Sequence, residues 1–350
     1  MSDIISQLAK EMNLSQRTIY RALHNPAATT RAAVARRAEE ICSRAAMLGY
    51  RTNVAARSIR NGNFKQMLFV TARFDQSPVA TLSSYITVLA ELLLQRGCRL
   101  LLEELLIDRR TGMMVKPKKL FSEHCSDGIF AVVSAGHFPS EMETALTELG
   151  LPLVWLNHCP STPGAGVVIS DESDAITEMC RHLAAVGHRR VAFLTLEYAH
   201  YSAAHRKREM ERAAKETGLE LVVLHTNESQ ETSCCRRTAN HFLDNYFPEY
   251  TAVVCYNREF MEVFRLEAGK RGIAIPGQLS VCHFISISER QVITEFPQTG
   301  VRIPEAEMAH EALKRMDLLT AGLPAGASTI SVPASFTIGE STASPDGTGQ

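Results

Sequence analysis

The polar residues with the clearest chemical purpose lie close together near the start of the chain. They carry amide, guanidinium and hydroxyl groups, and they are Ser15, Gln16, Arg17, Thr18, Tyr20 and Arg21. In the major groove of DNA an arginine fits the two acceptors of guanine, and a glutamine fits the acceptor and donor of adenine. The hydroxyl groups of Thr18 and Tyr20 suit phosphate oxygens. These residue types favour contact with double-stranded DNA over the alternative, a solvated face of an ordinary helix.

Two short helices joined by a tight turn would present these groups on one side. Apolar residues recur at helical spacing from Ile5 to Met12 and again from Ile19 to Leu23. Between the two runs, Asn13 can adopt the left-handed conformation that ends a helix, and the Ser15 hydroxyl can cap the next helix. The pattern therefore predicts a helix-turn-helix with the polar groups on the outside of its second helix.

A third helix and a shorter helix-capable stretch follow. The apolar stripe from Thr30 to Leu48 predicts the third helix, and Gly49 ends it. The stretch from Asn53 to Gly62 is too short to be stable alone. We expect it to fold when two copies pair on DNA, where Ile59 would wedge between base steps of the minor groove. The alternative is an unstructured linker.

The charge of the chain is divided unevenly along the sequence. Residues 1–65 hold 11 Lys and Arg against 4 Asp and Glu, a net charge of +7, although the whole chain has a net charge of −1. A polyanion such as DNA would be attracted to the positive end. Charge alone leaves a second interpretation open, namely a basic surface that serves only solubility.

The sequence gives no indication of other kinds of site. The nine cysteines form no C-x-x-C pair, which predicts reduced thiols in the cytoplasm and no disulfide or zinc framework. No signal peptide or membrane-spanning stretch is recognisable, so we expect neither export nor membrane insertion. Phosphate-loop, dinucleotide-binding and hydrolase motifs are absent, so we expect no enzyme activity and no cofactor. No common metal-ligand spacing occurs in the histidine cluster, which consists of His182, His188, His200 and His205.

Several short pieces of the N-terminal region keep a distinctive order and spacing. They are Leu8-Ala9-Lys10, Leu14-Ser15, Thr18-Ile-Tyr-Arg-Ala-Leu23, Leu48-Gly-Tyr-Arg51 and the run from Asn53 to Gly62. In this combination the chain resembles the lactose-repressor (LacI/GalR) family of bacterial transcription regulators, and the resemblance continues to Gly339-Glu-Ser-Thr-Ala343. The resemblance implies base reading and hinge contacts by Gln16, Arg17, Arg21, Asn53, Arg57 and Ile59, the last standing where the family usually has a leucine lever.

From Gln66 onward, short apolar runs of strand character alternate with amphipathic helical stretches. The predicted strands are Met67–Thr71, Leu100–Ile107, Gly128–Val133, Pro152–Leu156, Arg190–Thr195, Leu219–Leu224, Ala252–Tyr256 and Leu279–Phe284. The predicted helices are Ala80–Arg96, Ser173–Val186, Ser202–Thr217 and Glu259–Arg271. Such alternation is typical of parallel sheets covered by helices on both faces, and the number of strands indicates two sheets.

The resemblance implies a fold for the whole chain. An all-α helix-turn-helix DNA-binding head would precede an α/β periplasmic-binding-protein-like sensor made of two doubly wound parallel-sheet lobes. The expected parts are the head at 1–50, the hinge helix and linker at 51–65, the first lobe at 66–162 with 291–323, the second lobe at 163–290 with 324–343, and a disordered tail at 344–350. Turn-rich segments at Pro160–Gly166 and Thr320–Gly326 fit two of the crossings between lobes.

The same resemblance places four polar residues in the cleft between the lobes, Asn157, Arg206, Asn257 and Arg258. Two acids that the family uses are replaced, one by Arg258 and one by Ile285, and Asn157 stands where an aspartate is common. An isoleucine cannot accept hydrogen bonds from sugar hydroxyls as a carboxylate does. The hypothesis that follows is that the ligand is an anionic sugar or metabolite, phosphorylated or carboxylated, and that Arg206 and Arg258 hold it. The alternative is a solvated Arg258 and a cleft without ligand control.

The resemblance implies a cytoplasmic transcription regulator, a repressor of the LacI type. A homodimer would bind a pseudo-palindromic DNA operator, and a small-molecule effector in the cleft would change the spacing of the paired heads. One alternative is a solute-binding protein of the same two-lobed fold with no regulatory role. Another is an enzyme built on doubly wound sheets, for which no acid, base or nucleophile constellation can be located.

Overall fold

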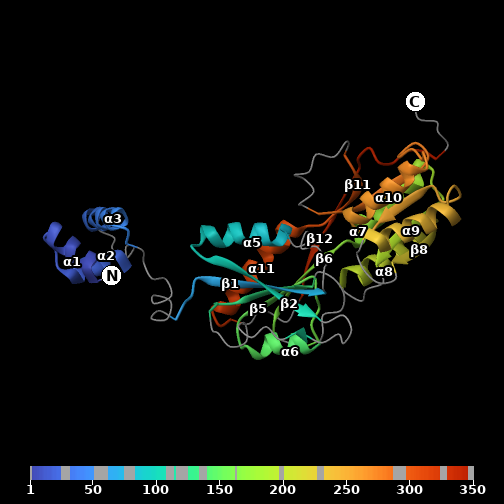
Figure 1. The fold of residues 1–350 in the computed structure, drawn as a ribbon. Helices are drawn as coiled ribbons and strands as arrows, with labels where there is room; N and C mark the ends of the chain where they lie inside the picture. Colours follow the sequence, from blue (N-terminus) through green and yellow to red (C-terminus); the bar gives the residue numbers. More distant parts are fainter. Residues whose placement is uncertain are drawn as a thin grey trace. The chain divides into compact units, whose positions relative to one another are not determined.

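The computed structural model describes residues 2–24, 32–50, 62–74, 83–107, 114–115, 125–133, 140–161, 164–196, 201–226, 232–286, 297–323 and 329–345. The chain forms two compact units, Met1–Lys65 and Gln66–Gln350 (Figure 1). Asn53, Arg57 and Ile59 lie outside the described residues. The hinge helix and its DNA contacts therefore stay predictions.

The described residues of the first unit form three helices. They are α1 (Ser2–Glu11), α2 (Gln16–His24) and α3 (Ala32–Met47). Leu8 from α1, Ile19 from α2 and Ile41 from α3 are buried together and form the centre of a small core. Asn13, with a φ of 50°, adopts the left-handed conformation after α1, and Gly49, with a φ of 76°, adopts it after α3. The predicted helix-turn-helix is therefore confirmed.

The described residues of the second unit form two sheets, and the first sheet has seven strands. In spatial order they are β12 (Ile330–Pro333), β6 (Gly166–Asp171), β5 (Leu153–Leu156), β4 (Ile129–Val133), β1 (Gln66–Phe74), β2 (Arg99–Ile107) and β3 (Met114–Val115). Neighbouring strands run parallel except for β2 and β3. One face is covered by α5 (Ser83–Gln95) and α11 (Glu305–Thr320), and the other by α6 (Ser140–Glu148), as Figure 1 shows. This sheet and its three helices are the first lobe.

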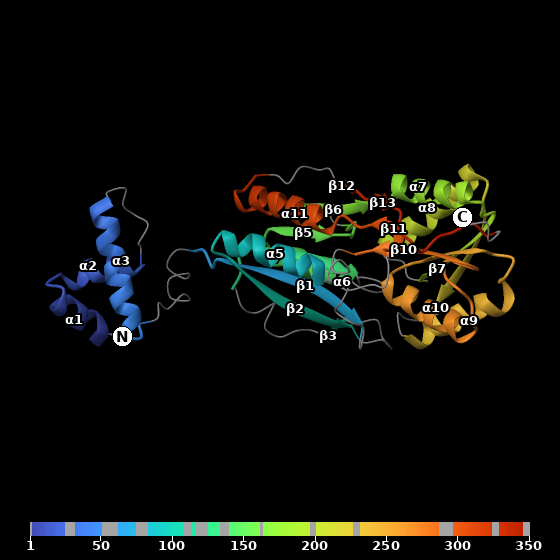
Figure 2. The ribbon, with the colours of Figure 1, turned by 90° about the horizontal axis from the view of Figure 1, so that it is seen from above.

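The second sheet has six strands. In spatial order they are β13 (Ser335–Thr337), β11 (Thr299–Arg302), β10 (Ser280–Ile285), β9 (Ala252–Cys255), β7 (Arg190–Leu196) and β8 (Glu220–Thr226). Neighbouring strands run parallel except for β11 and β13. On one face α7 (Ser173–Val186) packs with α8 (Tyr201–Thr217), and on the other α9 (Thr232–Asn245) packs with α10 (Arg258–Lys270) (Figure 2). This sheet and its four helices are the second lobe, and two doubly wound lobes agree with the predicted fold class.

Three of the predicted lobe boundaries are wrong. A boundary at residue 163 would place β6 in the second lobe, but β6 pairs with β5 and β12 in the first sheet. A boundary at 291 would place β11 in the first lobe, but β11 pairs with β10, and the boundary at 324 misplaces β12 in the same way. The chain crosses between the sheets near Glu172, Ile303 and Ala334. Turn-rich composition marks a loop, but it does not show to which sheet the next short strand belongs.

The C-terminal segment is anchored on the second lobe. The Val281 backbone N–H donates to the carbonyl oxygen of Ser341 at 2.9 Å. Ser344 and Pro345, which the sequence assigns to a disordered tail, lie close to Gly187. The tail prediction is therefore wrong for these two residues, and residues 346–350 lie outside the described ranges.

Candidate functional sites

The outer face of α2 carries the polar groups that the sequence places on DNA. Ile19 and Leu23 of this helix are buried in the core of the first unit. The predicted DNA-reading residues are all exposed, and they are Ser15, Gln16, Arg17, Thr18, Tyr20 and Arg21. The helix therefore presents two guanidinium groups and several hydroxyl groups to the solvent.

Hydrogen bonds at the start of α2 fix part of this surface. The backbone N–H of Thr18 donates to Ser15 Oγ at 3.1 Å, which is the predicted N-cap. Gln16 Nε2 donates to Ser6 Oγ of α1 at 3.1 Å. Because the Gln16 amide nitrogen is engaged inside the unit, Arg17 and Arg21 are the stronger candidates for base contacts.

Arg206, near the start of α8, is the best-defined of the four predicted ligand-binding residues. Its side chain is buried, and its guanidinium carbon lies 4.7 Å from the ring centre of Tyr256 and 4.1 Å from that of Phe284. Nη1 donates to the carbonyl oxygen of Tyr256 at 3.1 Å, and Nη2 donates to Glu172 Oε1 at 3.1 Å. The two rings and the two hydrogen bonds hold the guanidinium plane in place.

Glu172 is a site residue that the sequence analysis missed. It lies between β6 and α7, where the chain first crosses between the lobes, and its side chain is fully buried. Besides Arg206, its Oε1 accepts from Ser170 Oγ at 3.0 Å. His205 Nε2 lies 3.4 Å from Oε2, but it accepts from the Glu172 backbone N–H at 3.3 Å. The sequence signal for Glu172 is a polar residue directly after an apolar strand. It was missed because β6 was not recognised as a strand.

Asn157 follows β5 and is held in the left-handed conformation with a φ of 49°. Its Oδ1 accepts from the Ser170 backbone N–H at 2.9 Å, and its Nδ2 donates to Tyr85 Oη at 3.1 Å. Burial raises the pKa of Tyr85 well above its usual value, and the negative charges of Glu305 and Glu172 raise it further. Tyr85 is therefore a neutral phenol. Both polar ends of the Asn157 amide contact the protein, so its side chain connects α5 with β6.

The remaining two predicted ligand-binding residues begin α10. Asn257 Oδ1 accepts from the backbone N–H of Phe260 at 2.9 Å and caps the helix. Arg258 Nε lies 3.5 Å from Glu262 Oε1 on the same helix, and its side chain is 23% exposed. The structure thus brings Asn157 and Arg206 into one buried network through Ser170 and Glu172, whereas the contacts of Asn257 and Arg258 lie within α10.

Six side chains, all buried except the partly buried Asn157, form an interlobe cluster, defined as Tyr85, Asn157, Glu172, Arg206, Tyr256 and Phe284. Glu172 follows β6, Tyr256 follows β9 and Phe284 is the penultimate residue of β10. In open sheets of parallel strands, ligands bind outside the carboxyl ends of the strands. The cluster therefore lies where the fold places a ligand.

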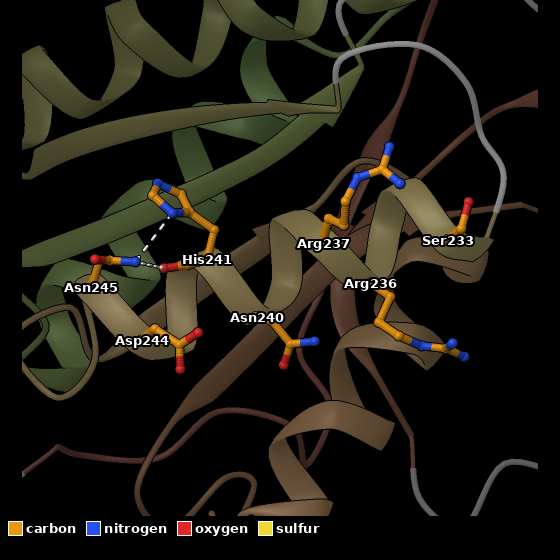
Figure 3. Close-up of a pocket in the computed structure, with 7 residues that line it drawn as sticks. All are labelled: Ser233, Arg236, Arg237, Asn240, His241, Asp244 and Asn245. Atoms are coloured by element: carbon orange, nitrogen blue, oxygen red, sulfur yellow. Dashed lines mark hydrogen bonds between the residues drawn. The ribbon is translucent and has the colours of Figure 1, made fainter.

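A surface hollow of about 510 Å³ lies along the exposed side of α9 (Figure 3). Its lining residues are Ser233, Arg236, Arg237, Asn240, His241, Asp244 and Asn245. Arg236 pairs with Glu267 at 3.1 Å, and Asp244 pairs with Arg271 at 2.6 Å. These charges have partners on the protein itself, so the hollow shows no preference for a ligand.

Metal, membrane and disulfide sites can be assessed for the ranges that the structure covers. No group of three or more His, Cys, Asp or Glu in these ranges could hold a metal ion. None of the helices within them has both the length and the apolar character for a membrane span. All nine cysteines are free thiols, and those at 180, 234, 235, 255 and 282 are buried.

Comparisons with known proteins find relatives in sequence and in structure. Residues 180–342 match a family model described as a periplasmic binding protein-like domain. An uncharacterized HTH-type transcriptional regulator in the aml 5' region of Streptomyces limosus is 31% identical over 176 residues, which cover 48% of this chain and 48% of that protein. The arabinose metabolism transcriptional repressor of Geobacillus stearothermophilus is 24% identical over 225 residues, which cover 61% of this chain and 56% of that protein. The chain spans about half the length of these curated relatives.

A solved structure extends the likeness to almost the full length. The lac repressor dimer bound to operator and the anti-inducer ONPF has a TM-score of 0.72 and 15% identity, and the match covers 96% of this chain and 98% of that chain. The two chains therefore share their fold. The curated relatives add a similarity in sequence to transcriptional regulators over 48% and 61% of this chain. In this chain the helix-turn-helix unit that contains α1 to α3 is followed by the unit that contains the two sheets.

Proposed function

We propose that this chain is a transcription regulator that reads a DNA operator through α2 and senses a small molecule in its two-lobed unit. The observation that carries the proposal is the exposed polar face of α2, the second helix of a helix-turn-helix, with Arg17 and Arg21 on it. A helix of this kind lies in the major groove and contacts base edges. Both curated relatives are named as transcriptional regulators, one of them as a repressor, so we propose repression.

We further propose that a homodimer binds a pseudo-palindromic operator. Two identical reading units related by a two-fold axis match a site with the same symmetry. The related lac repressor structure is a dimer on its operator. The nine free thiols suit a reducing compartment, so we propose that the regulator acts in the cytoplasm.

The effector is proposed to bind at the interlobe cluster, with Arg206 as its central contact and Asn257 and Arg258 at its edge. The sequence favoured an anionic effector, which would need uncompensated guanidinium groups. Arg206 pairs with Glu172, and Arg258 lies beside Glu262. Because both cations have carboxylate neighbours, an uncharged effector is better supported.

The proposal is tested by selecting bound sites from random duplex DNA with the full chain, with and without a panel of metabolites. We expect a two-fold symmetric site whose affinity changes with one class of metabolite. A protein that binds a metabolite but shows no preference for any duplex over random competitor would instead be a solute-binding protein of the same fold.

A further inference from the structure

Two thiols lie on consecutive residues at the start of α9. Cys234 and Cys235 are the third and fourth residues of this helix, and they are 5% and 3% exposed. The three remaining buried cysteines are not exposed at all. Ser233 and Arg237, on either side of the pair, line the surface hollow of α9 (Figure 3). A small reagent can therefore approach this end of the helix from the solvent.

The sulfur of Cys234 is next to a positive charge. Arg237 Nη2 donates to Cys234 Sγ at 3.1 Å. A guanidinium group beside a sulfur, and a position in the first turn of a helix, both favour the negatively charged thiolate, which is the form that attacks oxidants. Cys42 and Cys98 instead donate their S–H groups to backbone carbonyl oxygens at 3.7 and 3.8 Å, an arrangement that suits a neutral thiol. The contacts of Cys234 therefore favour its sulfur as a nucleophile.

The surroundings of Cys235 and Cys159 differ from those of Cys234. Burial and the neighbouring Cys234 raise the pKa of the Cys235 thiol to about 12, so this thiol stays protonated at neutral pH. Burial also raises the pKa of Cys159, although that residue is classed by its surface as exposed. Exposure alone would make Cys159 the first thiol to be oxidised, whereas the neighbouring charge favours Cys234.

We propose that Cys234 and Cys235 form a redox modification site, at which hydrogen peroxide oxidises the two thiols to a disulfide. The Cys234 thiolate attacks one peroxide oxygen, so that the S–O bond forms, the O–O bond breaks, and hydroxide leaves and takes up a proton. The Cys235 sulfur then attacks the Cys234 sulfur, and the hydroxyl group leaves as water with the Cys235 proton. Two thiols are oxidised, and one peroxide is reduced to two molecules of water. The inference does not depend on the proposed DNA and effector sites.

The disulfide does not fit the helix as it stands. Consecutive Cα atoms are about 3.8 Å apart, whereas Cα atoms joined by a disulfide are usually about 4.4 to 6.8 Å apart. The start of α9 must therefore change its backbone conformation when the disulfide forms. Arg236 is the next residue, and its Nε lies 3.1 Å from Glu267 Oε1 of α10. Oxidation would thus weaken a contact between α9 and α10.

The test is limited oxidation of the full chain by hydrogen peroxide, followed by alkylation of the remaining thiols with iodoacetamide and by peptide mass spectrometry. Trypsin releases residues 216–236 as one peptide that holds both cysteines and no other. We expect this peptide to lose two hydrogen atoms and to take up no iodoacetamide before Cys159 is oxidised. Dithiothreitol should restore both thiols. Amide hydrogen exchange at the start of α9 should be faster in the oxidised protein.

Three variants separate the parts of the site. Arg237→Gln keeps a polar side chain but removes the charge, so the pair should be oxidised about tenfold more slowly. Arg236→Gln is the matched control, because it removes the same charge from the same helix but from a residue that pairs with Glu267, and it should be oxidised at the wild-type rate. In Cys235→Ser, Cys234 should stop at the sulfenic acid, which dimedone traps.

Three outcomes overturn the inference. The first is a wild-type protein in which Cys159 is oxidised while the 216–236 peptide stays reduced. The second is an Arg237→Gln protein that is oxidised as fast as Arg236→Gln. The third is a Cys234 that proceeds to the sulfinic acid without any disulfide. Thermal unfolding of each variant is measured first, and the order of oxidation in the wild-type protein decides the matter if the variants do not fold.

Discussion

Arg21 is a residue whose exposure has a direct functional consequence. It lies on the same exposed side of α2 as Arg17, one position before the partly buried Ala22. Arg21→Ala should weaken binding to the selected operator by about 1 to 3 kcal/mol and relax the preference at one base pair. Mobility shifts with the operator and with its single-base variants measure both effects.

The control for Arg21 is Arg44→Ala on α3, which removes the same charge. Arg44 pairs with Glu40 at 2.9 Å on its own helix. We expect this variant to bind the operator with unchanged base preference. If Arg21→Ala behaves like Arg44→Ala, α2 does not read bases through this residue.

His188 makes folding stability depend on pH. Its ring nitrogens lie 2.8 Å from Thr251 Oγ1 and 3.0 Å from Ser280 Oγ, and burial lowers its pKa from 6.5 to about 4. Between these two values the unfolded chain binds more protons than the folded one. The contribution of His188 to the free energy of unfolding is therefore complete above pH 6.5. As the pH falls towards 4, roughly 2 to 3 kcal/mol of it is lost.

The measurement for His188 is the free energy of unfolding at several pH values. His188→Gln keeps a polar side chain but cannot titrate, so its stability should fall less steeply below pH 6.5 than that of the wild type. His241→Gln, on the exposed side of α9, is the control and should follow the wild-type curve. Equal slopes for the wild type and His188→Gln would contradict the role of His188.

The sequence could predict Arg206 but not its partner. Arg206 follows from a resemblance that is carried position by position along the chain. Glu172 is 34 residues away from Arg206 and meets it only when β6, α7 and α8 have assembled. Asn157 was predicted as a ligand contact, but its side chain connects Ser170 with Tyr85. Such contacts depend on tertiary structure, which one sequence does not reveal.

At the scale of elements, the pairing of β10 with β11 requires a glycine. Gly300 in β11 lies opposite His283 in β10, and a side chain at Gly300 would overlap the His283 carbonyl oxygen. Because backbone atoms must move to make room, Gly300→Ala should destabilise the chain by about 3 kcal/mol or more. Urea unfolding of the full chain measures the loss.

Gly269 in α10 is the matched control for this substitution. A methyl group at Gly269 would meet open space, and alanine favours a helix. Gly269→Ala should therefore stabilise the chain by about 0.5 to 1 kcal/mol. If both variants are destabilised to the same degree, crowding at β11 is not the cause.

The elements that the sequence predicted well are long or strongly apolar. The helix Ser173–Val186 has the predicted bounds, because its apolar stripe is regular. β6 was missed because its six residues alternate between buried and partly buried positions and follow a turn-rich segment. The bounds of α9 were not predicted, because its first turns consist largely of polar residues and cysteines. Short or polar elements are formed by packing against neighbours more than by their own pattern.

At the scale of the two-lobed unit, each lobe has its own core. Among the described residues, the apolar cluster of the second lobe shares no buried member with the two clusters of the first lobe. Polar contacts join the lobes: Ser84 Oγ lies 2.9 Å from Ser286 Oγ, and Tyr201 Oη donates to the Ser170 carbonyl oxygen at 3.2 Å. Few polar contacts between separate cores are typical of domains that move relative to each other.

Removal of the Tyr201 hydroxyl oxygen tests whether the two lobes move relative to each other. Tyr201→Phe removes the hydrogen bond from α8 in the second lobe to β6 in the first, which should shift the equilibrium towards open lobes by about 1 kcal/mol, or roughly fivefold. We expect a larger radius of gyration in small-angle X-ray scattering without effector and a weaker apparent affinity for the effector. Tyr250→Phe loses a hydrogen bond to Glu220 within the second lobe and should change neither quantity. Identical scattering and affinity for both variants would mean that the Tyr201 contact does not hold the lobes together. The lobes would then be held together through the contacts of Ser84, Ser286 and Glu305.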